Sequence, residues 1–113
     1  MLYEELGIFT LLTQIKSNKF LDHYADRYIG KLQEADSRQG SVLCETLEAW
    51  LAHGGNANAA AKDLFIHRNT MRYRMEKIYD ILNIESIDFE EALNLKMAFA
   101  IRKYRGSHRK PTP

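Results

Sequence analysis

One stretch of the chain, from Asn56 to Leu82, constrains the fold more than any other. It reads NANAAAKDLFIHRNTMRYRMEKIYDIL. Asn56 follows two glycines and precedes an alanine-rich run, so it suits a helix N-cap, where its side-chain oxygen can bond an otherwise unpaired backbone N–H. The alanines and Leu64 recur at helical spacing, which predicts a first helix over residues 57–64. The small alanines allow a second helix to cross closely after a short corner at residues 65–67.

A second helix is predicted from Arg68, where apolar residues resume at helical intervals. The members of this apolar stripe are Met71, Met75, Ile78 and Leu82. Such a stripe along one side of a helix is expected to be buried. At about 100° per residue, the opposite face presents Asn69, Tyr73 and Glu76. Hydrogen-bond donors therefore crowd the exposed face near its start.

Donors of these types suit the reading of DNA. Arg and Asn form paired hydrogen bonds with guanine and adenine edges in the major groove, while Thr, Tyr and Arg reach phosphates. A helix N-terminus also attracts phosphate. The candidate DNA-binding residues are Asn56, Asn58, His67, Arg68, Asn69, Thr70, Arg72, Tyr73, Arg74 and Lys77. His67 is predicted either to cap the second helix or to touch a base or phosphate.

The simplest competing interpretation of the second helix is an amphipathic core helix with a solvated basic face, which is the commoner meaning of any single arginine-bearing helix. The alanine helix, the short corner and the Arg-Asn-Thr opening occur together here. Their combination favours a DNA-reading helix-turn-helix.

The same residues resemble a known family. The segment GGNANAAAKDLFIHRNTMRYRMEKIYDIL is similar to the C-terminal helix-turn-helix of the PucR-type bacterial regulators, which include purine-catabolism and sugar-diacid activators. The run from His67 to Arg74 is the most specific mark, and the likeness extends from Leu43 through Tyr104. It is looser upstream, where YEELGIFTLL resembles the end of a preceding regulatory region. A weaker similarity links the segment to the factor for inversion stimulation. The resemblance implies a transcription-factor module whose second helix enters the major groove.

The corner differs from the generic helix-turn-helix at Phe65, where a glycine often stands. A left-handed residue other than glycine is strained by about 1–2 kcal/mol. Complete burial of a phenyl ring contributes roughly 1.5–3 kcal/mol, which would offset that strain. We therefore expect the Phe65 ring to be buried.

Composition excludes several classes of protein. The 113 residues, 45% hydrophobic and 27% charged, suit one globular domain. No run approaches the roughly 18 apolar residues of a membrane helix and no secretion signal is evident, so we expect a cytoplasmic protein. The single cysteine, Cys44, excludes an intramolecular disulfide and is expected in the core. No metal-ligand spacing, phosphate loop or nucleophile motif occurs, so the sequence predicts neither an enzyme nor a metal or cofactor.

The charge is unevenly distributed, although the net charge is only +1. Residues 1–55 carry five basic and eight acidic residues, whereas residues 56–83 carry five and three. Residues 84–101 carry one basic and four acidic residues, and residues 102–113 carry five basic residues and no acidic ones. The positive charge is therefore expected on the reading unit and on the tail.

Helical signals also occupy the residues before the reading unit. A short helix is expected from Leu2 to Lys16 with a break at Gly7, and Asn18 is expected to cap a second helix. The apolar face of that second helix comprises Phe20, Leu21, Tyr24, Tyr28, Ile29 and Leu32. Such a broad face needs a partner.

Two capping boxes predict two more helices. Asp36 with Gln39 is predicted to open a helix that runs through His53 and ends at Gly54. The expected buried residues of this bracing helix are Leu43, Leu47, Leu51 and, as anchor of the core, Trp50. Asp88 with Glu91 is predicted to open a last helix to about residue 104, after Asn83 ends the reading helix. The last helix has a broad apolar face, suited to packing on the bracing helix or to a dimer seam.

These signals together predict an all-α fold of five or six helices containing a helix-turn-helix, because no stretch alternates with period two. We interpret residues 1–35 as an N-terminal helical linker region and residues 36–105 as the helix-turn-helix DNA-binding domain. Residues 106–113, with two prolines and no apolar side chain other than proline, are expected to form a disordered tail.

The expected partner is double-stranded DNA, bound by a homodimer, because one reading helix covers only a few base pairs. Any small-molecule effector is expected to bind outside this chain. The alternative function is an all-α protein-interaction or dimerisation module without DNA binding, in which the arginine-rich helix pairs with acidic partners. Glu76 and Asp80, late in that helix, favour this alternative.

Overall fold

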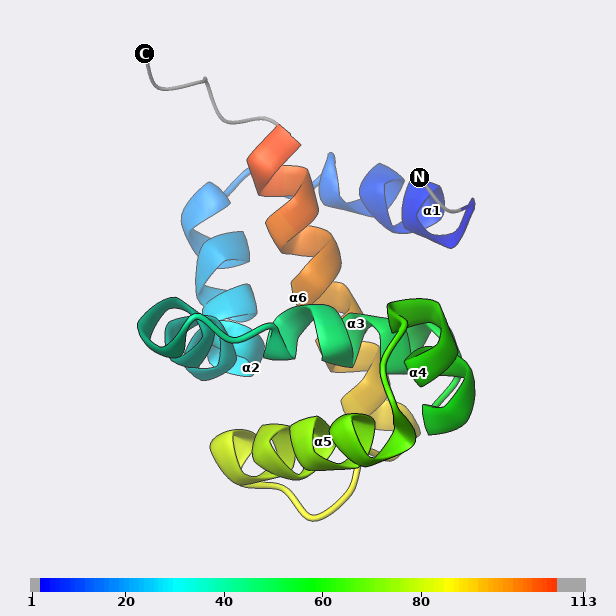
Figure 1. Ribbon diagram of the computed structural model, residues 1–113. Helices are drawn as coiled ribbons and strands as arrows, with labels where there is room; N and C mark the ends of the chain where they lie inside the picture. Colours follow the sequence, from blue (N-terminus) through cyan, green and yellow to red (C-terminus); the bar gives the residue numbers. More distant parts are fainter. Residues whose placement is uncertain (1–2, 108–113) are drawn as a thin grey trace.

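The computed structural model describes residues 3–107, which form six α-helices and no strand (Figure 1). The helices are α1 (Tyr3–Leu12), α2 (Asn18–Gln39), α3 (Leu43–Ala52), α4 (Ala57–Leu64), α5 (Arg68–Leu82) and α6 (Phe89–Ser107). The predicted all-α fold is confirmed. None of the described helices is long and apolar enough to cross a membrane.

The most extensive helix pair is α2 with α6, which lie side by side (Figure 1), and α2 also contacts α5. Leu21 and Ile29 of α2 and Leu95 and Ile101 of α6 belong to one buried cluster. The broad apolar face of α2 therefore finds its partner within the chain. The last helix packs mainly on α2, and less on α3 than the sequence suggested. Phe20 is an exception, because it is 58% exposed.

Helix α3 lies across the middle of the molecule and packs on α4 and α5, as predicted for a bracing helix. Leu43, Leu47 and Leu51 are buried. Trp50 is only half-buried, so Leu47, which is fully buried, is closer to the centre of the core than the predicted anchor. The indole lies over the turn after α3, where a Cβ at Gly55 would come within 3.1 Å of it.

The predicted opening of a helix at Asp36 is wrong. Asp36 lies in the last turn of α2, which continues to Gln39 and ends at Gly40 in a left-handed conformation with φ of 64°. The packing of α2 on α6 outweighs the local capping signal. The Asp36 carboxylate still caps a helix, but it caps α3 from a distance, accepting hydrogen bonds from the backbone N–H groups of Leu43 at 2.8 Å and Cys44 at 2.9 Å.

Other boundaries also differ from the predictions. Helix α1 passes through Gly7 without a break, and Ser17 rather than Asn18 caps α2, accepting from the Phe20 N–H. Cys44 is half-buried rather than a core residue. Helix α6 continues through residues 106 and 107, so the expected disordered tail is wrong there; residues 108–113 lie outside the described residues. The division of the chain at residues 35 and 36 stays a prediction.

Candidate nucleic-acid interface

Helices α4 and α5 form the predicted two-helix unit at the predicted boundaries. The Asn56 side chain accepts a hydrogen bond from the Ala59 N–H at 3.0 Å, which confirms it as the cap of α4. Ala60 and Ala61 are buried. Because both side chains are small, α4 approaches α3 and α5 closely.

The corner between α4 and α5 is a Schellman turn, in which two backbone N–H groups bond carbonyls of the last helical turn. Phe65 N–H bonds the Lys62 carbonyl at 3.2 Å, and Ile66 N–H bonds the Ala61 carbonyl at 3.0 Å. This pattern places Phe65 in the left-handed region, with φ of 58°. Ile66 turns inward against the core and the Phe65 ring is 95% exposed. The prediction of a buried Phe65 ring is therefore wrong.

The start of α5 is capped by His67, which lies in extended backbone with φ of −71°. Its Nδ1 accepts a hydrogen bond from the Asn69 N–H at 3.0 Å. An accepting Nδ1 requires an unprotonated nitrogen there, so the cap uses the neutral ring. Of the two predicted roles of His67, the capping role is confirmed.

The inner side of α5 is the predicted stripe. Met71, Met75 and Ile78 are buried and Leu82 is half-buried against the same core. At its far end Asn83 adopts the expected left-handed conformation, with φ of 57°. The stripe fixes which side of α5 faces solvent.

The outer side of α5 brings most of the candidate residues together. The exposed members are Arg68, Asn69, Thr70, Arg72 and Tyr73. Tyr73 is 59% exposed, and the Lys77 Nζ lies 5.8 Å from its ring centroid, a favourable contact between a cation and an aromatic face. Asn58 is exposed on α4, whereas the Asn56 side chain is engaged as the cap.

Arg74 differs from the other candidate residues because it points inward. Its Nη1 donates a hydrogen bond to Thr46 Oγ1 of α3 at 3.2 Å, and the side chain is partly buried. Thr46 was not among the predicted site residues. A threonine within an otherwise apolar helix face was the signal that could have drawn attention to it.

The family model of the PucR C-terminal helix-turn-helix domain matches residues 43–101, which include α3, α4 and α5 and most of α6. The chain belongs to this PucR helix-turn-helix family. The match begins at the first residue of α3 and therefore leaves out Asp36, which caps that helix.

Relatives of the PucR domain include named regulators. The chain is 32% identical to the proline-responsive transcriptional activator PutR of Bacillus subtilis over 89% of this chain and 25% of the relative. It is 30% identical to the carbohydrate diacid regulator of Escherichia coli, over 91% of this chain and 26% of the relative. It is 28% identical to the DNA-binding transcriptional activator AdeR of Bacillus subtilis, over 88% of this chain and 24% of the relative. The chain thus spans about a quarter of the length of these relatives. No solved structure matches it.

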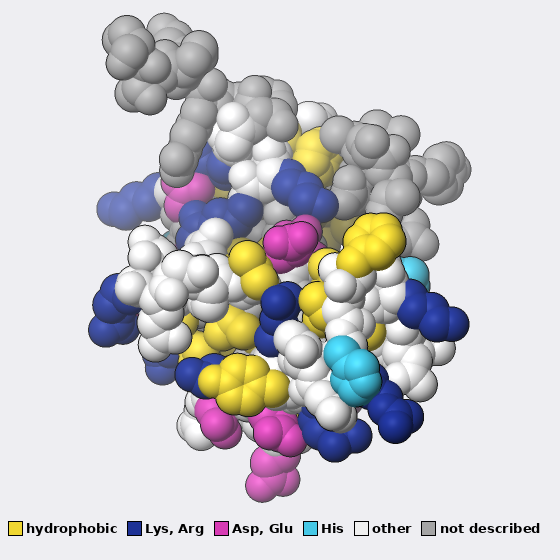
Figure 2. Space-filling model, viewed as in Figure 1, with side chains coloured by type: hydrophobic (Ala, Val, Ile, Leu, Met, Phe, Trp, Pro, Cys, Tyr) yellow, Lys and Arg dark blue, Asp and Glu magenta, His cyan; other side chains and the backbone are white. Residues whose placement is uncertain are grey.

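The PucR domain has less unpaired positive charge near the end of the chain than the sequence suggested. Three cations of α6 are engaged by acidic residues: Arg105 bonds Asp22 at 2.8 Å, Arg102 lies 3.9 Å from Asp26 and Lys103 lies 3.2 Å from Glu48. In Figure 2, Lys and Arg side chains lie at the lower right, over the start of α5, and also over the left and upper parts of this face. Within the helix-turn-helix, α4 carries one basic and one acidic residue, Lys62 and Asp63, so the net positive charge of the candidate interface comes from α5.

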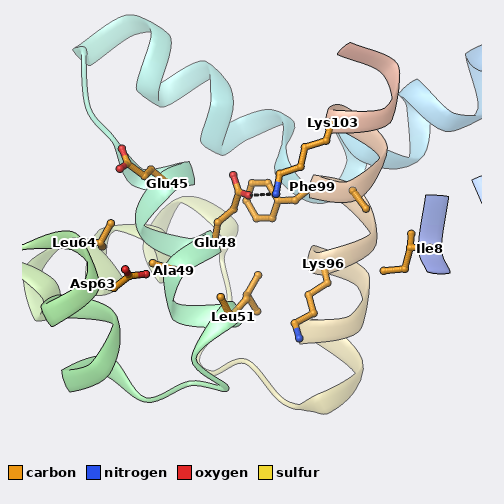
Figure 3. Close-up of a pocket in the computed structure, with 12 residues that line it drawn as sticks. Ile8, Glu45, Glu48, Ala49, Leu51, Asp63, Leu64, Lys96, Phe99 and Lys103 are labelled. Carbon is orange, nitrogen blue, oxygen red and sulfur yellow. Dashed lines mark ion pairs between the residues drawn. The ribbon is translucent and has the colours of Figure 1, made fainter. Parts of the chain in front are cut away.

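A cavity of about 410 Å³ lies between α1, α3, α4 and α6. Leu51, Leu64 and Phe99 line it, and the ion pair between Glu48 and Lys103 crosses its rim (Figure 3). No α5 residue contributes to this lining. The cavity is therefore separate from the outer face of α5.

Proposed function

We propose that this chain is the sequence-specific DNA-binding module of a bacterial transcriptional regulator that acts in the cytoplasm. The observation that carries the proposal is the division of α5 into two sides. The inner side is fixed in the core by Met71, Met75 and Ile78, while the outer side presents hydrogen-bond donors from its first turn onward. A helix of this kind fits the major groove of B-DNA.

The proposed roles follow from side-chain chemistry. Arg68 and Asn69, at the start of α5, can form paired hydrogen bonds with guanine and adenine. Thr70, Arg72 and Tyr73 can bond phosphates beside the groove. His67 at the start of α5, Lys77 beside Tyr73 and the exposed Asn58 of α4 complete the proposed contact surface.

Binding as a homodimer belongs to the same proposal, since helix-turn-helix proteins gain affinity from two half-sites about one helical turn apart. Footprinting at saturation tests it. Two protected half-sites are expected, and a single one would contradict the dimer. We further propose that any small-molecule effector binds outside these residues.

The test of base reading is selection of bound duplexes from a random pool, followed by titration of the recovered duplex and a scrambled one. Arg68→Ala and Asn69→Ala should each reduce discrimination between the two by about 1–3 kcal/mol. Lys19→Ala is the matched control, because Lys19 is an exposed cation at the start of α2, at the end of the molecule away from α5 (Figure 1). Unchanged discrimination in Arg68→Ala would move base reading to other residues.

Salt dependence separates DNA binding from the alternative of a protein-interaction module. With about 6–10 phosphate contacts, affinity should fall by roughly 10³–10⁵-fold between 50 and 200 mM salt. Glu76 and Asp80 are exposed on the later part of α5, where the helix would be leaving the groove. Absence of duplex binding at low salt would favour the interaction module.

A further inference from the structure

Arg74 belongs to the reading helix but reaches into the protein. Its Nη1 donates to Thr46 Oγ1, and Thr46 is fully buried, the only buried polar residue among the described side chains. The Thr46 hydroxyl donates its own proton to the Val42 carbonyl at 2.8 Å. The oxygen lone pairs are therefore left to accept from Arg74, so the two bonds fit one hydroxyl without competition.

The acceptor is itself fixed in place. Thr46 lies in the second turn of α3, and the first turn of α3 is held by Asp36 through the N–H groups of Leu43 and Cys44. Asp36 also accepts from the Ser41 hydroxyl at 2.6 Å. A continuous set of hydrogen bonds thus connects the end of α2, the start of α3 and the middle of α5.

The apolar stripe of α5 and the Arg74 bond constrain different motions. Contacts of Met71, Met75 and Ile78 with the core hold α5 against α3 and set which side of it faces solvent, but they are non-directional and define its exact rotation less sharply than a directed bond does. A hydrogen bond to a buried, oriented acceptor has a preferred direction. Arg74 lies beside the stripe, where its bond opposes both rotation and sliding of α5. Base-reading side chains need orientation within about 10–20°.

We propose that Arg74 is a positioning residue: through Thr46 it sets the orientation of α5 at which Arg68 and Asn69 meet the base edges, and it does not bind phosphate. This inference rests on the proposed DNA binding. It assigns a role in specificity to a residue of α3 that does not reach DNA. A phosphate contact by Arg74 would instead support all sequences alike.

The test compares Thr46→Val, which keeps the shape and removes the acceptor, with Thr46→Ser, which keeps the hydroxyl. Each protein is titrated with the duplex recovered by selection and with a scrambled duplex of equal length, at several salt concentrations. Thr46→Val and Arg74→Ala should each lower the ratio of the two affinities by about tenfold, the effect of one hydrogen bond to a charged group. Thr46→Ser should restore it, and the double variant should lose no more than Arg74→Ala alone.

The salt slope distinguishes positioning from phosphate binding. A phosphate contact contributes about 0.9 to the slope of log affinity against log salt. Arg74→Ala should leave this slope unchanged. A slope that became smaller by about 0.9 in Arg74→Ala, together with normal specificity in Thr46→Val, would overturn the inference but leave the proposed function intact. Wild-type protein that binds neither duplex at low salt would overturn both.

Loss of fold is separated from loss of orientation by circular dichroism and by amide chemical shifts. Binding is compared at a temperature at which every variant retains its helical signal. In the absence of DNA, Thr46→Val should shift the amide resonances of Arg68, Asn69 and Tyr73, while Thr46→Ser should not. Unmoved resonances in a folded Thr46→Val protein would overturn the positioning role.

Discussion

Helices α3 and α4 are neighbours in sequence and in space, yet their first turns are stabilised in different ways. Helix α4 begins at a cap supplied by the adjacent residue, Asn56, whereas α3 begins at a cap supplied by Asp36 of the preceding helix. At the other end, α3 closes on Gly54, and α4 closes on Phe65 with nearly the same φ, 62° against 58°.

The difference shows how much of each helix is determined locally. Every capping interaction of α4 comes from residues within or next to it, so its boundaries follow from its own sequence. Helix α3 has no side-chain cap from its N-cap residue, Val42, and depends on the arrangement of α2. A local motif therefore defines the start of α4, whereas tertiary structure defines the start of α3.

Asp36→Ala should have the largest effect on stability. It removes three hydrogen bonds to a partly buried carboxylate, two from backbone N–H groups and one from the Ser41 hydroxyl. The free energy of unfolding should therefore fall by about 2–3 kcal/mol. Urea denaturation followed by circular dichroism measures it. Asp36→Asn, which keeps an acceptor oxygen, should lose less. A loss smaller than that of Asn56→Ala would show that α3 is not held from α2.

Acid should weaken α3 selectively. Burial alone would raise the pKa of Asp36, but hydrogen bonds from Ser41 and from the backbone of Cys44 and Leu43 lower the pKa below its ordinary value. Because the pKa of Asp36 is lower in the folded protein, its carboxylate contributes to the free energy of unfolding. This contribution is fully present above the pKa of the unfolded state, about 3.9, and is lost as the pH falls through the pKa of the folded state. The difference in the free energy of unfolding between wild type and Asp36→Asn should therefore shrink below about pH 4. The difference between wild type and Asn56→Ala should stay constant over the same pH range.

Asn56→Ala should have a smaller and purely local effect. Loss of one N-cap bond, to the Ala59 N–H, lowers the free energy of unfolding by about 1 kcal/mol. Asn56→Asp retains the acceptor and serves as the control in the same denaturation series. If Asn56→Asp were as unstable as Asn56→Ala, the cap would not be the source of the effect.

Phe65→Gly should have the smallest effect, and it should be stabilising. Relief of left-handed strain exceeds the added chain entropy of glycine by about 0.5 kcal/mol, because the exposed ring contributes no packing that would be lost. Phe65→Ala should be nearly neutral. Gly54→Ala, just after α3, is the reverse change, and thermal unfolding should show a loss of about 1 kcal/mol in the free energy of unfolding. A destabilised Phe65→Gly would show that the ring packs against the protein.

Sequence patterns predicted the parts of the fold whose signals are local. The bounds of α4 and α5 and the caps at Asn56, His67 and Asp88 follow from short motifs, and the structure confirms them. Asp36 was identified as the cap of the bracing helix but was wrongly placed in that helix: it belongs to α2, and its carboxylate reaches the first N–H groups of α3 only when α2 and α3 are folded together.

The candidate site was predictable to a similar degree. The outer face of α5 follows from helical periodicity, and the structure brings most of its predicted residues together. The inward direction of Arg74 depends on Thr46, 28 residues earlier, and no spacing rule connects them. The exposure of Phe65 depends on which residue of the Schellman turn faces the core; the prediction considered Phe65 alone, whereas Ile66 is the residue that packs against the core.

The pairing of α2 with α6 has a consequence for the kinetics of the molecule. Arg105 and Asp22, which join these helices through two hydrogen bonds, are 83 residues apart, so folding has to close most of the chain into a loop before this contact forms. Helices α3, α4 and α5 lie within that loop. Because α2 also packs on α5, we expect the slowest amide exchange in α5 to depend on separation of α2 from α6.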